Sequence, residues 1–205
     1  MVFDGIQIHG AHGYLLSQFM NPLFNKRKDS YGGDISGRSK FLLEVYDKIR
    51  EGVGNDYLIS VKLNCEDFVD GGATEKEMLW VCKELSKRNI DLIEVSGGSV
   101  ISRKNEGVIR VGIKNINDEG YFQSFAEKIS KLINTPISTV GGIRTYEKVL
   151  SVFENTNIQF VSLARPLLCE PNLINEWESG NYTKAFCKSC NGCLNPKGSR
   201  CILKK

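Results

Sequence analysis

The sequence predicts an α/β fold built on a parallel sheet of about five strands. Short strand-like segments alternate with amphipathic helical segments along nearly the whole chain, which is the pattern of βα units joined by right-handed crossovers. Polar or glycine-rich residues follow each strand, and in a parallel sheet those positions meet at one edge, as in a TIM barrel. An open doubly wound sheet is the alternative, because strand order cannot be read from the pattern.

Each element is predicted from apolar spacing and from the residues that bound it. Strands combine β-branched and aromatic residues between breakers, and helices repeat apolar residues every three or four positions. The first half has a strand with Phe3, Ile6 and Ile8, a helix over 36–52 with Ser36 as N-cap, a strand over 58–63, and a helix begun by the Thr74–Glu77 capping box. The second half has a strand over 91–95, a long loop, a helix with Phe122 to Ile133, a strand over 137–140, a helix with Tyr146 to Phe153, a strand over 160–163 and a short helix near 173–177.

Length and composition are those of an ordinary globular protein with one domain or at most two. The 205 residues carry 27 Lys and Arg against 24 Asp and Glu, a formal charge of +3. This charge is too small and too scattered to indicate binding to nucleic acid or to an anionic membrane. No apolar run reaches membrane-spanning length and no signal sequence opens the chain, so a cytoplasmic location is expected.

The chain divides into a body over 1–181 and a cysteine-rich tail over 182–205. Four of the seven cysteines lie in the tail, whereas Cys65, Cys82 and Cys169 are scattered through the body. This distribution indicates a reducing compartment with a terminal cysteine module, rather than the disulfide scaffold of a secreted protein.

A turn after the first strand holds both histidines of the chain, His9 and His12, with Tyr14 two residues further on. Two imidazoles and a phenol at the carboxyl end of a strand suit a site that binds an oxygen atom and delivers a proton. A plain surface turn is one alternative. A metal site is another, but no Cys, Asp or Glu follows at ligand spacing.

Several motifs resemble the old yellow enzyme family of flavin-dependent ene-reductases and NAD(P)H:flavin oxidoreductases. They are IHGAHGYL and NPLFNKRKDSYGGDISGRSKFLLEV near the start, then KLNCEDF, DLIEVSGG, STVGGIR and SLARPLL, in the order of the family. The resemblance begins at the family's fourth strand and runs to about Asn181. It implies the last five strands of a (β/α)8 barrel, the cofactor FMN, NAD(P)H as reductant, and an activated alkene or similar small molecule as acceptor.

The resemblance also assigns roles to individual residues. His9 and His12 would bind the acceptor's oxygen and Tyr14 would protonate its α-carbon. Lys62 stands where many members have Arg and would lie beside the flavin ring, keeping the charge without the forked geometry. The phosphate and ribityl chain would be held by Ser96, Gly97, Gly98, Gly141, Gly142, Ala164 and Arg165. Arg144, directly after a glycine pair, could as easily face solvent.

The tail carries Cys187, Cys190 and Cys193 at C-x2-C-x2-C spacing, followed by Cys201. Such spacing is common in iron–sulfur proteins, and zinc more often uses two separate C-x2-C pairs. Longer relatives resembling dienoyl-CoA reductase carry a cluster just after the barrel, with the last two cysteines more widely spaced. Reduced structural or redox-active thiols are the alternative.

A barrel of five strands leaves two sheet edges without neighbours. The chain is therefore expected either to be part of a longer protein with the remaining strands or to close against another chain, as a homo-oligomer or with a missing N-terminal half. Two further functions stay open beside the flavin enzyme: an inactive partner half that cannot hold flavin alone, and a metal-binding module whose working part is the tail.

Overall fold

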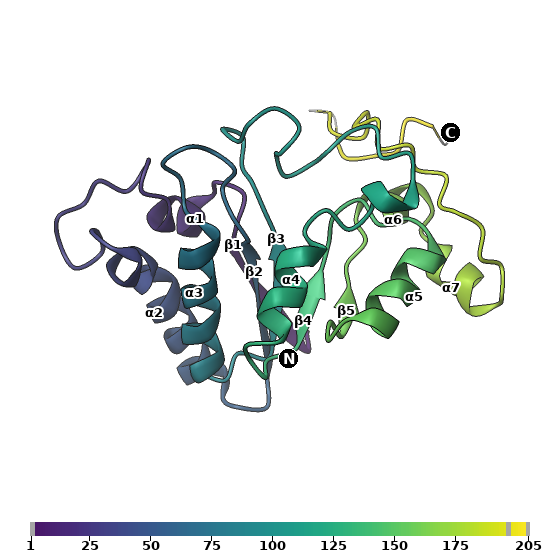
Figure 1. The fold of residues 1–205 in the computed structure, drawn as a ribbon. Helices are drawn as coiled ribbons and strands as arrows, with labels where there is room; N and C mark the ends of the chain where they lie inside the picture. The colour runs from purple at the N-terminus through teal and green to yellow at the C-terminus, as the bar shows by residue number, and fades with distance from the viewer. Residues whose placement is uncertain (1–2, 196–197, 204–205) are drawn as a thin grey trace.

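The computed structural model describes residues 3–195 and 198–203; positions 196, 197, 204 and 205 of the predicted tail lie outside this range. Across the described residues, one sheet holds five parallel strands in the order β1-β2-β3-β4-β5 (Figure 1). The strands are β1 Gly5–Gly10, β2 Leu58–Asn64, β3 Leu92–Ser96, β4 Ile137–Thr139 and β5 Phe160–Val161. Neighbours in the sheet are neighbours in the sequence, so the order lacks the reversal of a doubly wound sheet, and the predicted barrel portion is confirmed.

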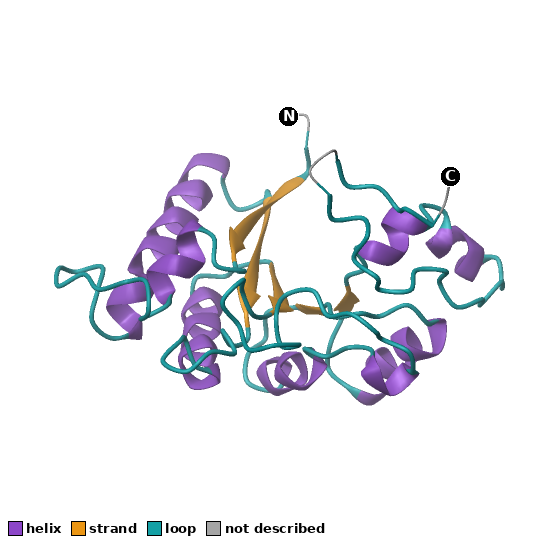
Figure 2. Cartoon of the chain, turned by 90° about the horizontal axis from the view of Figure 1, so that it is seen from above, coloured by secondary structure: helices purple, strands orange, loops and turns teal. Residues whose placement is uncertain are grey.

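Helices lie on the outer side of the curved sheet, as the view from above shows (Figure 2). They are α1 Leu15–Met20, α2 Ile35–Val53, α3 Glu75–Lys87, the 3-10 turn η1 Ile116–Asp118, α4 Gln123–Ser130, α5 Tyr146–Asn155, α6 Arg165–Cys169 and α7 Leu173–Glu178. Alternation along β2 explains the packing, because Ile59, Val61 and Leu63 are buried in the core while Ser60 and Lys62 belong to the opposite face. The inner face of the sheet is therefore polar.

Capping was predicted correctly at α3 and incorrectly at α2. Thr74 and Glu77 form the expected capping box, with the Glu77 carboxylate accepting from the Thr74 backbone N–H at 2.9 Å. At α2 the N-cap is Asp34, which accepts from the backbone N–H groups of Ser36 and Gly37. Ser36 lies one residue inside the helix and donates its hydroxyl to Asp34 at 2.6 Å. Asp and Ser are both common N-cap residues, and Asp34 and Ser36 lie two positions apart, so the sequence alone did not distinguish between them.

The predicted helices are otherwise present, and two short ones, α1 and α6, were not predicted. In α5 the buried residue is Val152, whereas Phe153 is exposed. The last two strands end earlier than expected, at Thr139 and Val161. These differences arise where the segments are short and periodicity is weak.

Two exposed apolar residues and the tail lie at opposite ends of the strands. Phe3 and Leu58, at the amino end of β1 and β2, are 72% and 60% exposed. The tail crosses the carboxyl end of the sheet beside α6, at the top of Figure 1. Among the described residues, no helix is both long and apolar enough to cross a membrane.

Candidate active site at the carboxyl edge of the sheet

The turn after β1 brings three predicted catalytic side chains together. The ring of His9 lies with its centroid 5.1 Å from that of His12 and 5.2 Å from that of Tyr14. Tyr14 is 64% exposed and directly precedes α1. The cluster can therefore present imidazole and phenol groups to one small molecule on the inner side of the sheet.

His12 owes its position to a buried network behind the turn. Its backbone has a φ of 65°, a left-handed conformation that costs energy for a residue other than glycine. Its N–H donates to the Asn64 side chain at 3.1 Å, and Asn64 donates to Asp67 at 2.9 Å. Asp67 also accepts from Asn21 at 2.7 Å and from the Ala73 backbone at 2.9 Å. Burial raises the pKa of Asp67, and these hydrogen bonds oppose the rise.

Burial and the nearby Lys62 cation favour the neutral form of both imidazoles. Burial, the nearby Lys62 cation and His9 lower the pKa of His12 to about 3. The pKa of His9 is also lowered, by burial first and then by Lys62, while Glu94 acts in the opposite direction. One His12 ring nitrogen, Nε2, lies 2.7 Å from the Ser96 hydroxyl. A neutral imidazole carries one N–H group, so it can donate one hydrogen bond to the oxygen atom of a bound substrate.

Lys62 is held by a buried carboxylate that the sequence did not reveal as part of the site. Its ammonium donates to Glu94 at 2.8 Å, and the other Glu94 oxygen accepts from Gln7 at 2.9 Å. All three side chains come from the inner face, one from each of β1, β2 and β3. Alternation was the available signal, because Glu94 lies two residues before Ser96 on the same face of its strand.

One cavity of about 420 Å³ connects the two ends of the predicted site. His12, Lys62 and Ser96 line one part of it, and Gly142, Ala164 and Arg165 line another. The remaining predicted residues, His9, Tyr14, Gly97, Gly98 and Gly141, are not among its lining side chains. Gly97 has a packing role instead, since a Cβ there would lie 2.7 Å from Phe122 and 2.8 Å from the Cys65 sulfur.

Two arginines fasten the cysteine tail beside this cavity. Arg144 is buried rather than facing solvent, and its Nη1 donates to the Cys187 carbonyl at 2.7 Å while Nη2 contacts the Ser189 hydroxyl. Arg165 uses Nη1 to reach the Asn191 side chain at 2.6 Å and the Arg110 carbonyl at 2.9 Å. The tail is thus part of the cavity wall, to which it contributes Cys187, Ser189, Cys193 and Leu194.

The four tail cysteines are not assembled as one metal site. Cys187 and Cys193 line the cavity and Cys190 is exposed. The Cys201 thiol lies instead 3.3 Å from the sulfur of Cys169, at the end of α6. Across the described residues, no group of three or more His, Cys, Asp or Glu side chains is arranged to hold a metal ion.

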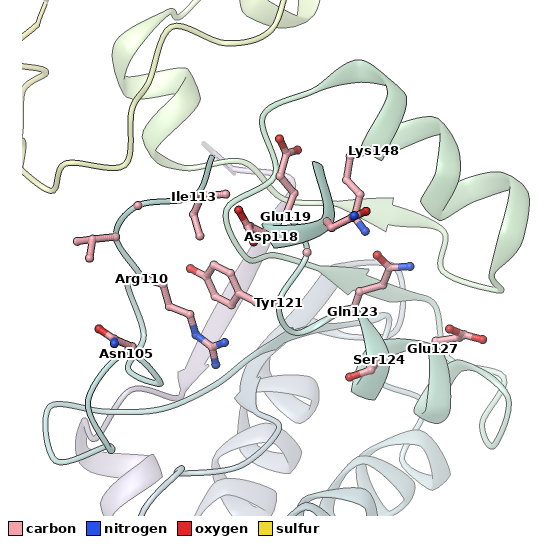
Figure 3. A pocket seen from close by; sticks show the side chains of 14 residues that line it. Asn105, Arg110, Ile113, Asp118, Glu119, Tyr121, Gln123, Ser124, Glu127 and Lys148 are labelled. Carbon is pink, nitrogen blue, oxygen red and sulfur yellow. The ribbon is translucent and has the colours of Figure 1, made fainter. Parts of the chain in front are cut away.

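A second, larger cavity of about 600 Å³ lies on the other side of Tyr121 (Figure 3). Arg110 stacks on the Tyr121 ring at 4.5 Å, and Gln123 and Lys148 line another part of the wall. Tyr121 lines both cavities. None of the residues predicted for catalysis or cofactor binding lines the second cavity, so the smaller one is the candidate active site.

Comparison with known proteins decides the family. Residues 2–184 match the family described as NADH:flavin oxidoreductase / NADH oxidase. The chain belongs to this family. It is 36% identical to an NADH oxidase of Thermoanaerobacter brockii over 94% of this chain and 29% of the relative. A metal reductase of Desulforamulus reducens is 34% identical over 94% of this chain and 28% of that protein.

Solved structures agree with the family assignment. A 2-naphthoyl-CoA reductase superposes with a TM-score of 0.80 at 26% identity, over 92% of this chain and 28% of that one. An old yellow enzyme homologue from Zymomonas mobilis has a TM-score of 0.68 at 22% identity, over 96% of this chain and 52% of that one. The resemblance to old yellow enzymes is thereby confirmed. The chain spans less than a third of the length of the curated relatives named above.

The residues of the smaller cavity fit the FMN that the family's name implies. Both hydrogen bonds that Arg165 makes within the described residues use Nη1, so the other edge of its guanidinium fork retains donors suited to a phosphate. Gly142 beside it has a φ of 74° and packs its backbone against Tyr121. At the other part of the cavity lies Lys62, whose ammonium is paired with Glu94.

The protonation of His12 gives a first prediction. The unfolded chain binds a proton at His12 near pH 6.5, whereas the folded chain does so only near pH 3. The stability that neutral His12 contributes is therefore present above pH 6.5 and is lost as pH falls toward 3. Heteronuclear NMR titration should show His12 still neutral at pH 5, with His9→Gln to assign the two imidazoles. A His12 that titrates near pH 6.5 would contradict this.

The Asp67 network gives a second prediction. Asp67→Ala should lower the free energy of unfolding by about 3 kcal/mol, because it leaves the amides of Asn21 and Asn64 and the Ala73 N–H buried without their acceptor. Urea denaturation measures the change. Asp70→Ala is the matched control, since the Asp70 side chain is fully exposed and should show no measurable effect. Equal behaviour of the two variants would show that the network does not stabilise the turn.

Proposed function

We propose that this chain is the carboxyl-terminal barrel portion of an FMN-dependent NAD(P)H oxidoreductase of the old yellow enzyme type. The observation that carries the proposal is the single cavity that joins His12 and Lys62 to Arg165. An elongated cofactor with a ring at one end and a phosphate at the other matches this distribution of groups. Bound FMN would supply hydride transfer, first from NAD(P)H and then to an activated alkene or similar acceptor.

The chain's own residues would orient the acceptor and move a proton. His9 and His12, both with lowered pKa, would donate hydrogen bonds to a carbonyl or nitro oxygen and stabilise the negative charge that grows there. Tyr14, beside His9, would give its phenolic proton to the α-carbon. Each role follows the family's motif and the grouping of the three rings.

Lys62 would lie beside the flavin ring, and Ser96, Gly142, Ala164 and Arg165 would hold the phosphate and ribityl chain. The ion pair with Glu94 shares the Lys62 charge with a carboxylate 2.8 Å away, so Lys62 would stabilise a reduced flavin less than an unpaired cation would. Gly97, Gly98 and Gly141 would act by letting the loops pack closely, since they do not line the cavity.

The alternatives concern what completes the barrel. The relatives named above are more than three times the length matched here, so a full active site would need the strands that precede β1 in the family, from the same protein or from a partner. A second copy of the chain could cover the exposed residues Phe3 and Leu58. The reducing compartment inferred from the cysteines stays a prediction.

We also propose that the tail can bind a metal ion or an iron–sulfur cluster through Cys187, Cys190, Cys193 and Cys201. The C-x2-C-x2-C spacing supports this, and binding would require Cys201 to leave Cys169. Iron, zinc and acid-labile sulfide analysis of protein purified without oxygen should find metal that Cys190→Ser removes. Cys82→Ser, at a buried core position, should retain it. Metal-free protein in both cases would contradict the assignment.

A titration of the chain with FMN, followed by flavin fluorescence, tests the main proposal. Saturable binding is expected, and Arg165→Ala should weaken it roughly tenfold to hundredfold because a charge-assisted hydrogen bond to phosphate is lost. Arg103→Ala is the control, because this half-exposed arginine pairs with acidic residues outside the cavity. Absence of binding at high protein concentration would favour a partner half that cannot hold flavin alone.

A further inference from the structure

The segment between Cys187 and Cys201 is fixed to the barrel at its beginning. The Ala185 N–H donates to the Arg144 carbonyl at 2.9 Å, and the Arg144 guanidinium donates to the Cys187 carbonyl at 2.7 Å. Four residues later, Asn191 accepts from Arg165 at 2.6 Å. The first part of the tail therefore rests on two buried or partly buried arginines from the loop after β4 and from the start of α6.

The far part of the tail returns to the same helix. Ile202 packs on the backbone of Gly192, so closely that a Cβ at Gly192 would lie 2.2 Å from the Ile202 side chain. This contact places the preceding residue, Cys201, against Cys169, with 3.3 Å between the sulfur atoms. A disulfide bond needs about 2.05 Å, so the two sulfurs are about 1.3 Å from bonding distance.

The two thiols differ in accessibility. Cys169 is 3% exposed at the carboxyl end of α6, whereas Cys201 is partly exposed on the tail. A small oxidant therefore reaches Cys201 first. Cys190 is exposed as well, but among the described residues its thiol does not face a second sulfur as Cys201 faces Cys169. The pair therefore combines an accessible thiol, Cys201, with a buried thiol, Cys169, in contact with it.

We propose that Cys169 and Cys201 form a thiol pair that peroxide converts into an intrachain disulfide. Hydrogen peroxide oxidises the Cys201 thiol to a sulfenic acid and is reduced to water. The Cys169 sulfur then attacks the Cys201 sulfur, the S–S bond forms, and the hydroxyl group leaves as a second water with the Cys169 proton. Two thiols and one peroxide thus give one disulfide and two waters.

The consequence is a covalent link between the tail and the helix that carries Arg165 at its first position. Cys187, Ser189, Cys193 and Leu194 line the candidate active site, so the disulfide would hold one wall of the cavity in place. It would also keep Cys201 away from any metal in the tail. This pairing does not depend on flavin binding.

Peptide mapping tests the pairing on the unmodified chain. The protein is reduced, freed of reductant, treated with an equimolar amount of hydrogen peroxide, blocked with N-ethylmaleimide and digested under non-reducing conditions. Mass spectrometry should find the Cys169–Cys201 cross-link as the main disulfide, and dithiothreitol should remove it. Cys201 joined to Cys187, Cys190 or Cys193, or recovered as an unpaired sulfenic acid, would overturn the proposal.

Matched variants and a second measurement test the consequence for the tail. Cys169→Ser should abolish the cross-link and Cys190→Ser should retain it. Trypsin cleavage at the exposed Lys188 should be slower in the oxidised chain than in the reduced chain, and Cys169→Ser should remove this difference. Equal cleavage rates in oxidised and reduced protein would show that the disulfide does not hold the cavity wall.

Discussion

The buried carboxylate of Asp67 is the interaction on which the candidate active site depends. It accepts hydrogen bonds from Asn21 at the end of α1, from Asn64 at the end of β2 and from the backbone of Ala73 before α3. Asn64 in turn accepts the N–H of His12. Three segments and the histidine turn are thus joined through one side chain, which allows His12 to keep a left-handed backbone that an isolated turn would avoid.

Much of this arrangement could be predicted from the sequence because it follows local rules. The Thr74–Glu77 helix cap and the alternation along β2 each depend on residues that lie only a few positions apart in the sequence. The parallel-sheet rule then brings His12, Lys62, Ser96 and Arg165 to one edge. Asp67, Glu94 and the contact of Cys201 with Cys169 were missed. Asp67 to Asn21, Glu94 to Lys62 and Cys201 to Cys169 are contacts between residues more than 30 positions apart, and alternation along β3 places Glu94 on the inner face without revealing its partner.

The inner face of the sheet departs from the apolar filling that is typical of a TIM barrel. Gln7, Lys62 and Glu94 form a chain of hydrogen bonds across three strands, with the carboxylate between a neutral amide and a cation. Such a chain gives the buried Glu94 carboxylate two hydrogen-bond donors, without which its burial would be costly. It also places charge of both signs beside the imidazoles. Burial is the main cause of the lowered pKa values of His9 and His12, Lys62 lowers both further, and Glu94 opposes the shift at His9.

The sequential strand order has a consequence for the dynamics of the molecule. Each strand pairs only with strands that adjoin it in the sequence, so the sheet can open from one end without disrupting the other. β1, which leads into the His12 turn, has six residues and β5, which leads into Arg165, has two, and in the described part of the chain each of them pairs with one neighbouring strand. Hydrogen exchange should therefore be graded along the sheet. The Arg165 end of the cavity would open locally more often than the His12 end. A phosphate bound at Arg165 would therefore lie in the more flexible part of the cavity, and a flavin ring near His12 in the more rigid part.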